Sequence, residues 1–468
     1  MRWACILLPQ LALDGALRRR ADPEAPLVLV AGSAQRRVLH AANPAARALG
    51  LRPGMALTAA QALATGFEVL DHDPREVLRW QRFLAAWAYR FSSQVSLRHP
   101  HALIVEIGAS HGLFGPWPRF EARLREELAA LGFRHRIVAA PNPAAARALA
   151  NVHDGLAVPD GEALHRALGQ LPAARAGFAP EVATALARMG LRRLAQVRAL
   201  PRASLARRFP AAVLGHLDAL WGDAAQPLEW YRPPDRFDAR IELGFEVESH
   251  QALLFPLRRL TADLAAYLAG RDGGVQRFEL HLEHEDAADS VVTVGLLGTE
   301  REPALLFDVA RTRLERAGVP APVRGLRLLA RELPAFAPAH RELFEDRPQQ
   351  SMPWEQLRER LRARLGDDAV HGLRVHPDHR PEHAWRGESA AKPGAGVAAP
   401  RPGWLLPRPI PLRGRPELLA GPERIESGWW DGDVRRDYYR VATRQGQQAW
   451  VYAPPGEQGG WMLHGWFG

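Results

Sequence analysis

The pattern of hydrophobic and polar positions divides the first 170 residues into short apolar runs and amphipathic segments. Each apolar run has about the length of a strand that is buried on both faces. The amphipathic segments between them, such as residues 74–91 and 119–131, have the spacing of helices that cover a sheet. This alternation predicts an α/β domain. The expected strands are residues 3–8, 26–31, 37–42, 103–107 and 136–140.

One helix in this region carries an aromatic stripe. Its apolar residues recur at helical spacing, so they share one broad face. We expect this face to be part of the core and not a ligand site. The residues of the stripe are Leu78, Trp80, Phe83, Leu84, Trp87 and Phe91.

A different pattern follows between residues 171 and 335. Residues 171–232 predict a group of short helices, whereas residues 236–335 predict the order β-α-β-β-α-β of a split βαβ unit. Period-two alternation places Arg277, Glu279, His281 and Glu283 on one face of the second strand, so this face is mixed in charge. The expected strands are residues 240–245, 276–283, 290–296 and 323–332, and the expected helices are residues 253–269 and 303–317.

The last part of the chain is a linker region followed by an aromatic-rich segment. Prolines break the pattern after residue 334, and residues 336–385 hold a basic helix at 355–365. Residues 386–403 are rich in Gly, Ala and Pro, and we expect them to be a disordered linker. Residues 404–468 hold six of the 14 tryptophans, with turn signals and aromatic alternation that predict a small β-rich domain.

Composition and charge narrow the class of protein. The chain has 468 residues and a net charge of +9, and Lys392 is the one lysine among its 61 basic residues. This excess of arginine favours a polyanionic partner such as DNA, but a GC-rich coding sequence explains the same bias. The single cysteine, Cys5, excludes a disulfide framework, and we expect it to be a buried small apolar residue. No apolar run reaches about 20 residues and no signal-peptide pattern is present, so we expect a cytoplasmic protein.

Two segments of the first domain resemble Y-family (translesion, UmuC-like) DNA polymerases. Residues 39–55 are similar to the fingers segment in which a tyrosine and an arginine hold the incoming triphosphate. Arg47 matches that arginine, whereas Pro44 stands in place of the tyrosine. Residues 139–150 are similar to the segment that follows the later palm strand. The resemblance implies that residues 1–170 form the palm and fingers, with Arg47 as a vestigial nucleotide contact.

Residues 171–232 resemble the helix-hairpin-helix thumb of the same family. Such hairpins direct backbone N–H groups at a DNA phosphate without reading sequence. Gly177 is kept, but Ala179 replaces the second glycine that these hairpins usually carry. The resemblance implies DNA contacts at Gly177, Arg192 and Arg193. A purely structural helical hairpin remains the alternative.

The rest of the chain extends the resemblance. Residues 236–335 match the little-finger domain that follows the thumb in these polymerases. Residues 421–430 and 461–467 are similar to the C-terminal signature of ImuB-type proteins, the diverged Y-family members of bacterial mutagenesis cassettes. The resemblance therefore covers nearly the whole chain apart from its linkers, and it implies that residues 404–468 form a partner-binding domain.

The positions that hold catalytic metals in this family carry no acid here. Nucleotidyl transfer needs two Mg²⁺ ions about 3.5–4 Å apart, and Mg²⁺ prefers carboxylate oxygens. The family takes one aspartate from the first strand and an Asp-Glu pair from a later palm strand. The matching positions are Leu7 and Leu8 on the first strand, and His101 and Ala102 on the later one. We therefore expect no bound metal, no cofactor and a rate lower by several orders of magnitude.

Two nearby acids keep a rival hypothesis open. Asp14 follows the first strand, and Glu106 lies on the later strand. A relocated metal site would need such acids to converge, and an active translesion polymerase would then result.

A short motif in the linker resembles the peptide by which bacterial polymerases dock on the β sliding clamp. That peptide is usually Gln-x-x-Leu-x-Phe, and the corresponding residues here are Gln349, Met352 and Trp354. The glutamine makes hydrogen bonds at one end of an extended segment, and the two apolar side chains fill a cleft at the other. Burial of a tryptophan at such a site contributes about 2 kcal/mol or more. The alternative is the start of an ordinary amphipathic helix.

The sequence therefore predicts an α/β and α+β multidomain protein with a Y-family polymerase-like architecture. By resemblance, it is a non-catalytic scaffold in SOS-induced translesion synthesis and mutagenesis, associated with the nucleoid. Its implied partners are the β sliding clamp, DNA, an error-prone C-family polymerase and a RecA-like accessory protein. The alternatives are the active polymerase described above and a stand-alone DNA-binding repair protein.

Overall fold

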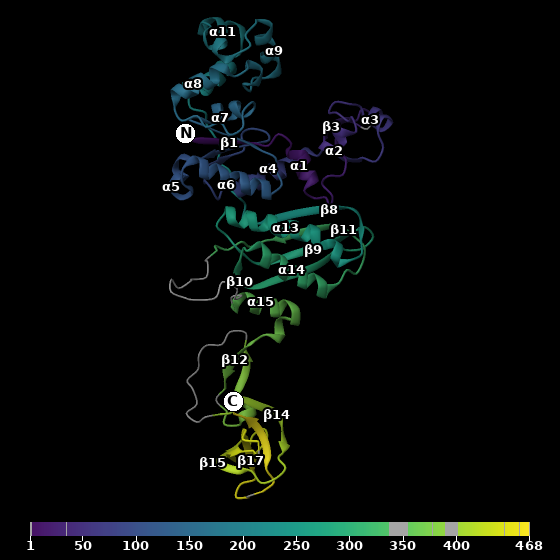
Figure 1. Cartoon of the computed structure of the whole chain (residues 1–468), viewed down its shortest axis with the longest axis vertical. Coiled ribbons are helices and arrows are strands. Elements are labelled where there is room, and N and C mark those ends of the chain that lie inside the picture. The colour runs from purple at the N-terminus through teal and green to yellow at the C-terminus, as the bar shows by residue number, and fades with distance from the viewer. Residues whose placement is uncertain are drawn as a thin grey trace. The chain divides into compact units, whose positions relative to one another are not determined.

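The computed structural model describes residues 2–33, 35–336, 354–376, 378–388, 401–443, 445–457 and 459–467 (Figure 1). The chain forms two compact units, Met1–Arg360 and Leu361–Gly468. The first unit contains elements β1 to β11, and the second contains elements β12 to β18. None of the helices in the described ranges is long and apolar enough to cross a membrane.

The centre of the first unit is a four-stranded antiparallel sheet in the order β5-β6-β1-β7. Helices α4 and α6 pack against one face, and α7 packs against the other. Because both faces are covered, nearly every residue of β1, β6 and β7 is buried, as the continuous apolar runs predict. The bounds are β1 Trp3–Leu7, α4 Pro74–Ala88, β5 Val95–Ser96, β6 Ala102–Glu106, α6 Trp117–Ala130, β7 Arg136–Ala140 and α7 Pro143–Ala150.

A smaller layer is inserted between β1 and α4. It is a three-stranded sheet in the order β3-β2-β4, and its core includes Leu39 and Ala46. Strand β4 is parallel to β2 and was not expected from the sequence. Its residues are mostly exposed at the sheet edge, so they carry no apolar run. The bounds are α1 Leu11–Leu17, β2 Leu27–Ala31, β3 Val38–Ala42, α2 Pro44–Ala48, α3 Leu57–Leu63 and β4 Glu68–Asp71.

The predicted aromatic stripe on α4 needs one correction. Leu78 is 43% exposed, whereas its neighbour Val77 is buried. The inward face runs through Val77, Trp80, Leu84 and Trp87, which recur at three- and four-residue spacing. Leu78 lies one position, or about 100°, around the helix from Val77 and so faces away from the core.

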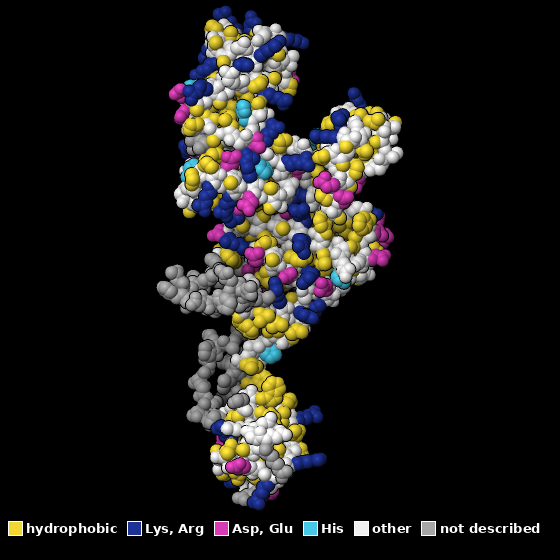
Figure 2. Space-filling model, in the orientation of Figure 1, with side chains coloured by type: hydrophobic (Ala, Val, Ile, Leu, Met, Phe, Trp, Pro, Cys, Tyr) yellow, Lys and Arg dark blue, Asp and Glu magenta, His cyan; other side chains and the backbone are white. Residues whose placement is uncertain are grey.

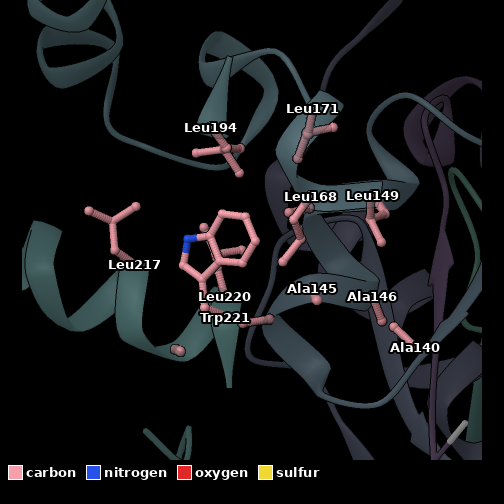
Figure 3. Close-up of a cluster of buried hydrophobic side chains, with 14 of the residues drawn as sticks. Ala140, Ala145, Ala146, Leu149, Leu168, Leu171, Leu194, Leu217, Leu220 and Trp221 are labelled. Atoms are coloured by element: carbon pink, nitrogen blue, oxygen red, sulfur yellow. The ribbon is translucent and has the colours of Figure 1, made fainter. Parts of the chain in front are cut away.

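The short helices after residue 160 share a core with the central sheet. Figure 3 shows the indole of Trp221 surrounded by leucines such as Leu168, Leu194 and Leu217. The same cluster continues through Leu149 of α7 to the sheet residue Ala140. These helices are therefore packed onto the central sheet and α7. The bounds are α8 Gly161–Gln170, α9 Pro180–Arg188, α10 Leu194–Arg198, α11 Arg202–Arg208 and α12 Ala211–Trp221.

The predicted β-α-β-β-α-β unit is present. Its four strands form an antiparallel sheet in the order β10-β9-β11-β8, with α13 and α14 packed against it. The alternation along β9 buries Phe278, Leu280 and Leu282. The bounds are β8 Phe237–Val247, α13 His250–Gly270, β9 Val275–His284, β10 Ser290–Glu300, α14 Pro303–Ala317 and β11 Val323–Ala330.

Helix α13 is also joined to the end of α1 through a buried ion pair. The guanidinium of Arg18, which caps α1, donates two hydrogen bonds to the carboxylate of Asp263, at 2.9 and 2.6 Å. Both side chains are almost completely buried, and Arg18 also donates to the backbone carbonyl of Leu131. Helices α13 and α4 approach each other so closely that a Cβ at Gly270 would lie 1.9 Å from the carbonyl oxygen of Ala86. Only glycine fits at position 270. The β-α-β-β-α-β domain is therefore closely packed against the central-sheet layer through α13 and α4.

The second unit is β-rich. Strands β14 to β18 form a five-stranded antiparallel sheet in the order β14-β18-β17-β16-β15, and β12 pairs with β13. Its core holds Tyr438, whose ring stacks on Trp450 with 4.0 Å between ring centroids. The predicted multidomain fold class is thus confirmed. The bounds are β12 Gly372–Val375, β13 Trp385–Glu388, β14 Trp404–Pro411, β15 Glu417–Ser427, β16 Val434–Ala442, β17 Gln448–Ala453 and β18 Met462–Trp466.

The expected linker is only partly described. Strand β13 extends to Glu388, so regular structure reaches into the first residues of the 386–403 segment. Residues 389–400 lie outside the described residues, and the expectation of disorder there stays a prediction. The hairpin of β12 and β13 was not expected, because two four-residue strands give too short a pattern to detect.

Candidate functional site

The four positions that would carry the metal-binding acids meet in the structure. Strands β1 and β6 are antiparallel neighbours, and Leu7 pairs with Ala102. One residue further, the backbone N–H of Leu8 donates to the carbonyl of His101 at 2.8 Å. The positions chosen from two distant stretches of sequence therefore form one corner at the end of this strand pair. We call the residues Leu7, Leu8, His101 and Ala102 the vestigial corner.

The side chains at the vestigial corner offer no oxygen ligand. Leu7 and Ala102 belong to the core on one side of the sheet, and Leu8 belongs to the core on the other. His101 is partly buried and has a φ of +55°, a region that favours glycine. Within the described ranges, no group of three or more His, Cys, Asp or Glu side chains is arranged to hold a metal ion.

Asp14, the first acid of the rival hypothesis, is already bound within the fold. It lies on α1, is 3% exposed and accepts the backbone N–H of Arg134 at 2.9 Å. Burial raises the pKa of its carboxyl group to about 6, against the lowering effect of that hydrogen bond and of the Arg134 charge. The carboxyl group therefore serves as a structural acceptor for the turn that leads into β7.

Glu106, the second acid, lies at the wrong end of its strand. It pairs with Trp3 at the start of β1, four residues away from Ala102, which is about 13–14 Å along a strand. Its carboxylate accepts from Nε of Arg2 and from the backbone N–H of Ala109, both at 3.3 Å. Asp14 and Glu106 therefore do not converge, whereas a two-metal site needs its ions only about 4 Å apart.

Imidazole rings gather near the vestigial corner. His40 of β3 and His72 after β4 stack with 3.9 Å between ring centroids. Burial lowers the pKa of His101, and the charges of His40 and Arg147 lower it further. Burial also lowers the pKa of His99 to about 4, with Arg147 the largest of the charged contributors. The imidazole rings and Arg147 give the vestigial corner a neutral or positive charge, which disfavours binding of a divalent cation.

Sequence reasoning did not find the imidazole group. His99 and His101 stand out as a His-Pro-His run, but His40 and His72 come from the inserted three-stranded sheet. The parallel pairing of β4 with β2 brings His72 beside β3. Because β4 was not expected, no signal in the sequence placed these rings together.

Arg47, the expected vestigial nucleotide contact, is exposed on α2. The helix starts cleanly, because Asn43 accepts the backbone N–H of Ala46 at 2.9 Å and Pro44 occupies the first turn. The carbonyl of Arg47 accepts from Arg52, but its guanidinium makes no ion pair with any described residue. The guanidinium remains available to an anion.

The expected DNA contacts lie in the thumb, at two different turns. Gly177 has a φ of +88° and lies just before α9, as a hairpin turn requires. Arg192 and Arg193 lie before α10, and their backbone N–H groups both donate to Oε1 of Gln196, at 2.8 and 3.0 Å. These two N–H groups are therefore satisfied within the protein, so any DNA contact at this turn must come from the arginine side chains.

The exposed face of the β10-β9-β11-β8 sheet is mixed in charge, as its alternation predicts. Arg240 donates to Glu283 at 2.5 Å, and Arg327 forms a two-pronged pair with Asp238 at 2.7 and 2.6 Å. Arginines that are paired in this way have less charge to offer to a phosphate backbone. By contrast, Figure 2 shows many basic side chains over the thumb helices.

The clamp-like motif is described only at its last residue. Gln349 and Met352 lie outside the described residues. Trp354 is the first residue of α15 (Trp354–Leu365) and is 58% exposed. Further along α15, Glu359 accepts the backbone N–H of Leu297, and Arg360 pairs with Asp308 at 2.7 Å. The helix that follows the motif is thus bound to the β-α-β-β-α-β domain.

Comparisons with known proteins show what the chain is similar to. Residues 16–151 match the impB/mucB/samB family. The chain is also 28% identical over 460 residues to Protein ImuB of Caulobacter vibrioides, from strain NA1000 / CB15N and from strain ATCC 19089, covering 90% of this chain and 100% of each relative. The predicted resemblance to ImuB-type, Y-family polymerase-like proteins is confirmed.

The solved structures that are similar to the chain include DNA polymerases. One is the insertion ternary complex of Dbh DNA polymerase, with 15% identity, a TM-score of 0.41 and coverage of 72% of this chain and 100% of that one. Another is DinB from Sulfolobus solfataricus, with 16% identity, a TM-score of 0.40 and the same coverage.

Proposed function

We propose that this protein is a non-catalytic scaffold of translesion synthesis in the SOS response. It links the β sliding clamp, DNA and an error-prone C-family polymerase, together with a RecA-like accessory protein. The polymerase-like domains supply the DNA-facing body, the Gln349–Trp354 motif supplies clamp docking, and residues 404–468 supply a partner-binding domain.

The vestigial corner is the observation that supports this proposal most strongly. Leu7 pairs with Ala102 at the place where two strands would present metal-binding carboxylates. Asp14 is engaged by the backbone of Arg134, and Glu106 lies at the far end of β6. Without carboxylates, no group in this corner balances the charge of two divalent cations and a triphosphate.

Primer extension with the purified full-length chain tests the absence of catalysis. We expect no template-directed product with Mg²⁺ or Mn²⁺ under conditions in which an active Y-family polymerase extends the same primer fully. The matched variants are Asp14→Asn and Glu106→Gln. A product made by the wild-type chain and lost in either variant would establish the active polymerase with relocated acids instead.

Clamp docking is tested with alanine replacements in the linker motif. Gln349→Ala, Met352→Ala and Trp354→Ala together should abolish binding to the purified sliding clamp and should abolish damage-induced mutagenesis. Gln350→Ala and Ser351→Ala occupy the gaps of the same motif and serve as matched controls that should bind normally. Unchanged clamp affinity in the triple variant would remove the docking proposal.

A stand-alone DNA-binding repair protein is separated from a scaffold by its partners. We expect the full-length chain to co-purify with the clamp and with an error-prone C-family polymerase from DNA-damaged cells. Recovery of DNA without either protein would favour the stand-alone function.

A further inference from the structure

The arginines of the C-terminal sheet fall into two groups. Of those described between residues 401 and 467, most have a partner: Arg401 pairs with Glu423, Arg424 with Asp437, Arg435 with Asp433, Arg436 with Glu382 and Arg440 with Gln448. The others are Arg408, Arg413 and Arg415, and they make no hydrogen bond or ion pair with any described residue. These three lie within eight residues of one another, on β14 and in the loop that follows it. Unpaired positive charge is therefore concentrated at one place in this unit.

A cavity of about 450 Å³ opens at the same place. One wall is the loop between β14 and β15, and the other is the segment that leads into β18. The backbone N–H of Leu412 donates to the carbonyl of Trp461 at 2.8 Å and holds the two walls together. The ring of Trp461 lies edge-on to Tyr439, with 5.1 Å between ring centroids, which fixes the indole.

The lining of this cavity combines apolar residues with polar surface and one charged residue. The large apolar residues of the lining are Leu412, Leu418, Trp461 and Met462, and Arg415 is its charged residue. The nearest acid in sequence, Glu417, forms no ion pair with Arg413 or Arg415. An apolar hollow beside unpaired guanidinium groups matches an apolar side chain with carboxylates next to it.

We propose that this cavity binds an extended acidic segment of a partner protein. A large apolar side chain enters the hollow against Trp461 and Met462, and flanking carboxylates pair with Arg408, Arg413 and Arg415. The inference rests on the proposed function, because it assigns residues to the partner-binding domain. Nucleic acid is the less suitable occupant, since a phosphate backbone would leave the apolar lining uncovered.

The test selects ligands from a random decapeptide display library on the full-length chain. We expect the selected peptides to carry Asp or Glu on both sides of a large apolar residue. Their affinity, measured by fluorescence polarisation, should fall at least about tenfold in Arg413→Glu/Arg415→Glu. Arg435→Glu, which reverses one charge at an exposed position of the same unit, should stay within about twofold of the wild type.

Two neighbouring leucines provide the apolar control. Leu418 lines the cavity and is 51% exposed, whereas Leu419 is 47% exposed and does not line it. Because Leu418 lines the cavity and Leu419 does not, Leu418→Ser should weaken peptide binding and Leu419→Ser should not. Selected peptides without acidic residues, or equal effects of the two leucine variants, would overturn the inference. Loss of single-stranded DNA binding in Arg413→Glu/Arg415→Glu, with peptide binding unchanged, would overturn it in favour of nucleic acid.

Clamp and polymerase binding by the same variants separates this inference from the proposed function. If the chain binds the clamp and an error-prone C-family polymerase but the arginine and leucine variants do not alter peptide affinity, the inference alone is wrong. If peptides bind as expected but the chain binds none of the proposed partners, the proposed function is wrong and the peptide site stands.

Discussion

Asp14 is a buried carboxyl group whose pKa is raised to about 6, chiefly by burial. The unfolded chain releases this proton near pH 4, whereas the folded chain keeps it until about pH 6. The folded state therefore binds more protons in this window, and its stability through Asp14 falls as pH rises from about 4 to 6. Above about pH 6 this contribution of Asp14 to the stability of the folded state is completely lost.

We predict that Asp14→Asn stabilises the protein relative to the wild type above pH 6. The amide oxygen still accepts the backbone N–H of Arg134, and it carries no charge to bury. Urea unfolding between pH 4 and 8 should give a difference in unfolding free energy that grows up to pH 6 and then stays constant. The stability of Asp14→Asn relative to wild type is compared at the two pH values. A lower relative stability at pH 8 than at pH 4 would show that the ionised carboxylate is favourable.

Arg18 and Asp263 make the second prediction at this scale. Because both charges are almost completely buried, removing one partner leaves the other unpaired in the core. Asp263→Ala should therefore cost about 3–5 kcal/mol of unfolding free energy. Arg271 and Asp235 form a pair of similar length whose aspartate is 93% exposed, so Asp235→Ala should cost less than about 1 kcal/mol.

The double variant Arg18→Met/Asp263→Leu provides the check on that prediction. It removes both charges and should recover most of the stability that Asp263→Ala loses. Denaturant titration of the single and double variants measures this coupling. Additive losses would show that the two side chains do not act as a buried pair.

Single residues also show the limits of sequence reasoning. Leu7, Leu8, His101 and Ala102 were identified as the places of the lost acids, and the structure brings all four together. The buried state of Cys5 was expected from its apolar neighbours and is confirmed. The ion pair of Arg18 with Asp263 was not expected, because 245 residues separate its partners and no periodic pattern reports such a contact.

At the scale of elements, regular buried patterns were predicted well and edge elements were not. Strands β1, β6 and β7 and the whole β-α-β-β-α-β unit follow from apolar runs and alternation. Strand β4 was missed because it lies at an edge and is mostly exposed. The buried face of α4 was predicted wrongly at Leu78. When apolar residues are found on several sides of a helix, their spacing does not show which side faces the core.

The turn before α10 leads to a prediction about DNA affinity. Gln196 already satisfies the backbone N–H groups of Arg192 and Arg193, so only the arginine side chains remain to contact phosphate. Arg192→Ala/Arg193→Ala should lower DNA affinity at all sequences. It should also reduce the slope of log affinity against log salt by about 1–2.

Arg166→Ala is the matched control for that experiment. Arg166 lies on α8 of the same helical group, is exposed and pairs with Glu162 at 2.8 Å. Fluorescence polarisation over a range of salt concentrations should show an unchanged slope for this control. An unchanged slope in the double variant as well would favour the purely structural hairpin.

At the scale of the whole molecule, the chain consists of two compact units that we expect to have separate tasks. We predict that a chain ending at residue 403 keeps clamp binding and loses binding to the error-prone polymerase. The physical reason is that the five-stranded sheet begins at Trp404 and forms its own core around Tyr438 and Trp450. Pull-downs with both purified partners measure this, and a truncated chain that still binds the polymerase would place that contact in the first unit.

The multidomain order was predictable from sequence because each domain has its own pattern. The arrangement of unpaired arginines around the C-terminal cavity was not, because it depends on which acids the fold assigns to the other arginines. Arg401 and Glu423, for example, are 22 residues apart and meet only in the folded unit.

The most direct measurement of the central claim is a crystal of the full-length chain with primer, template, an incoming nucleotide and Mn²⁺. Anomalous scattering would locate every bound Mn²⁺ ion. We predict no pair of Mn²⁺ peaks beside Leu7 and Ala102. Two peaks about 3.5–4 Å apart and held by Asp14 or Glu106 would contradict the account and identify an active polymerase.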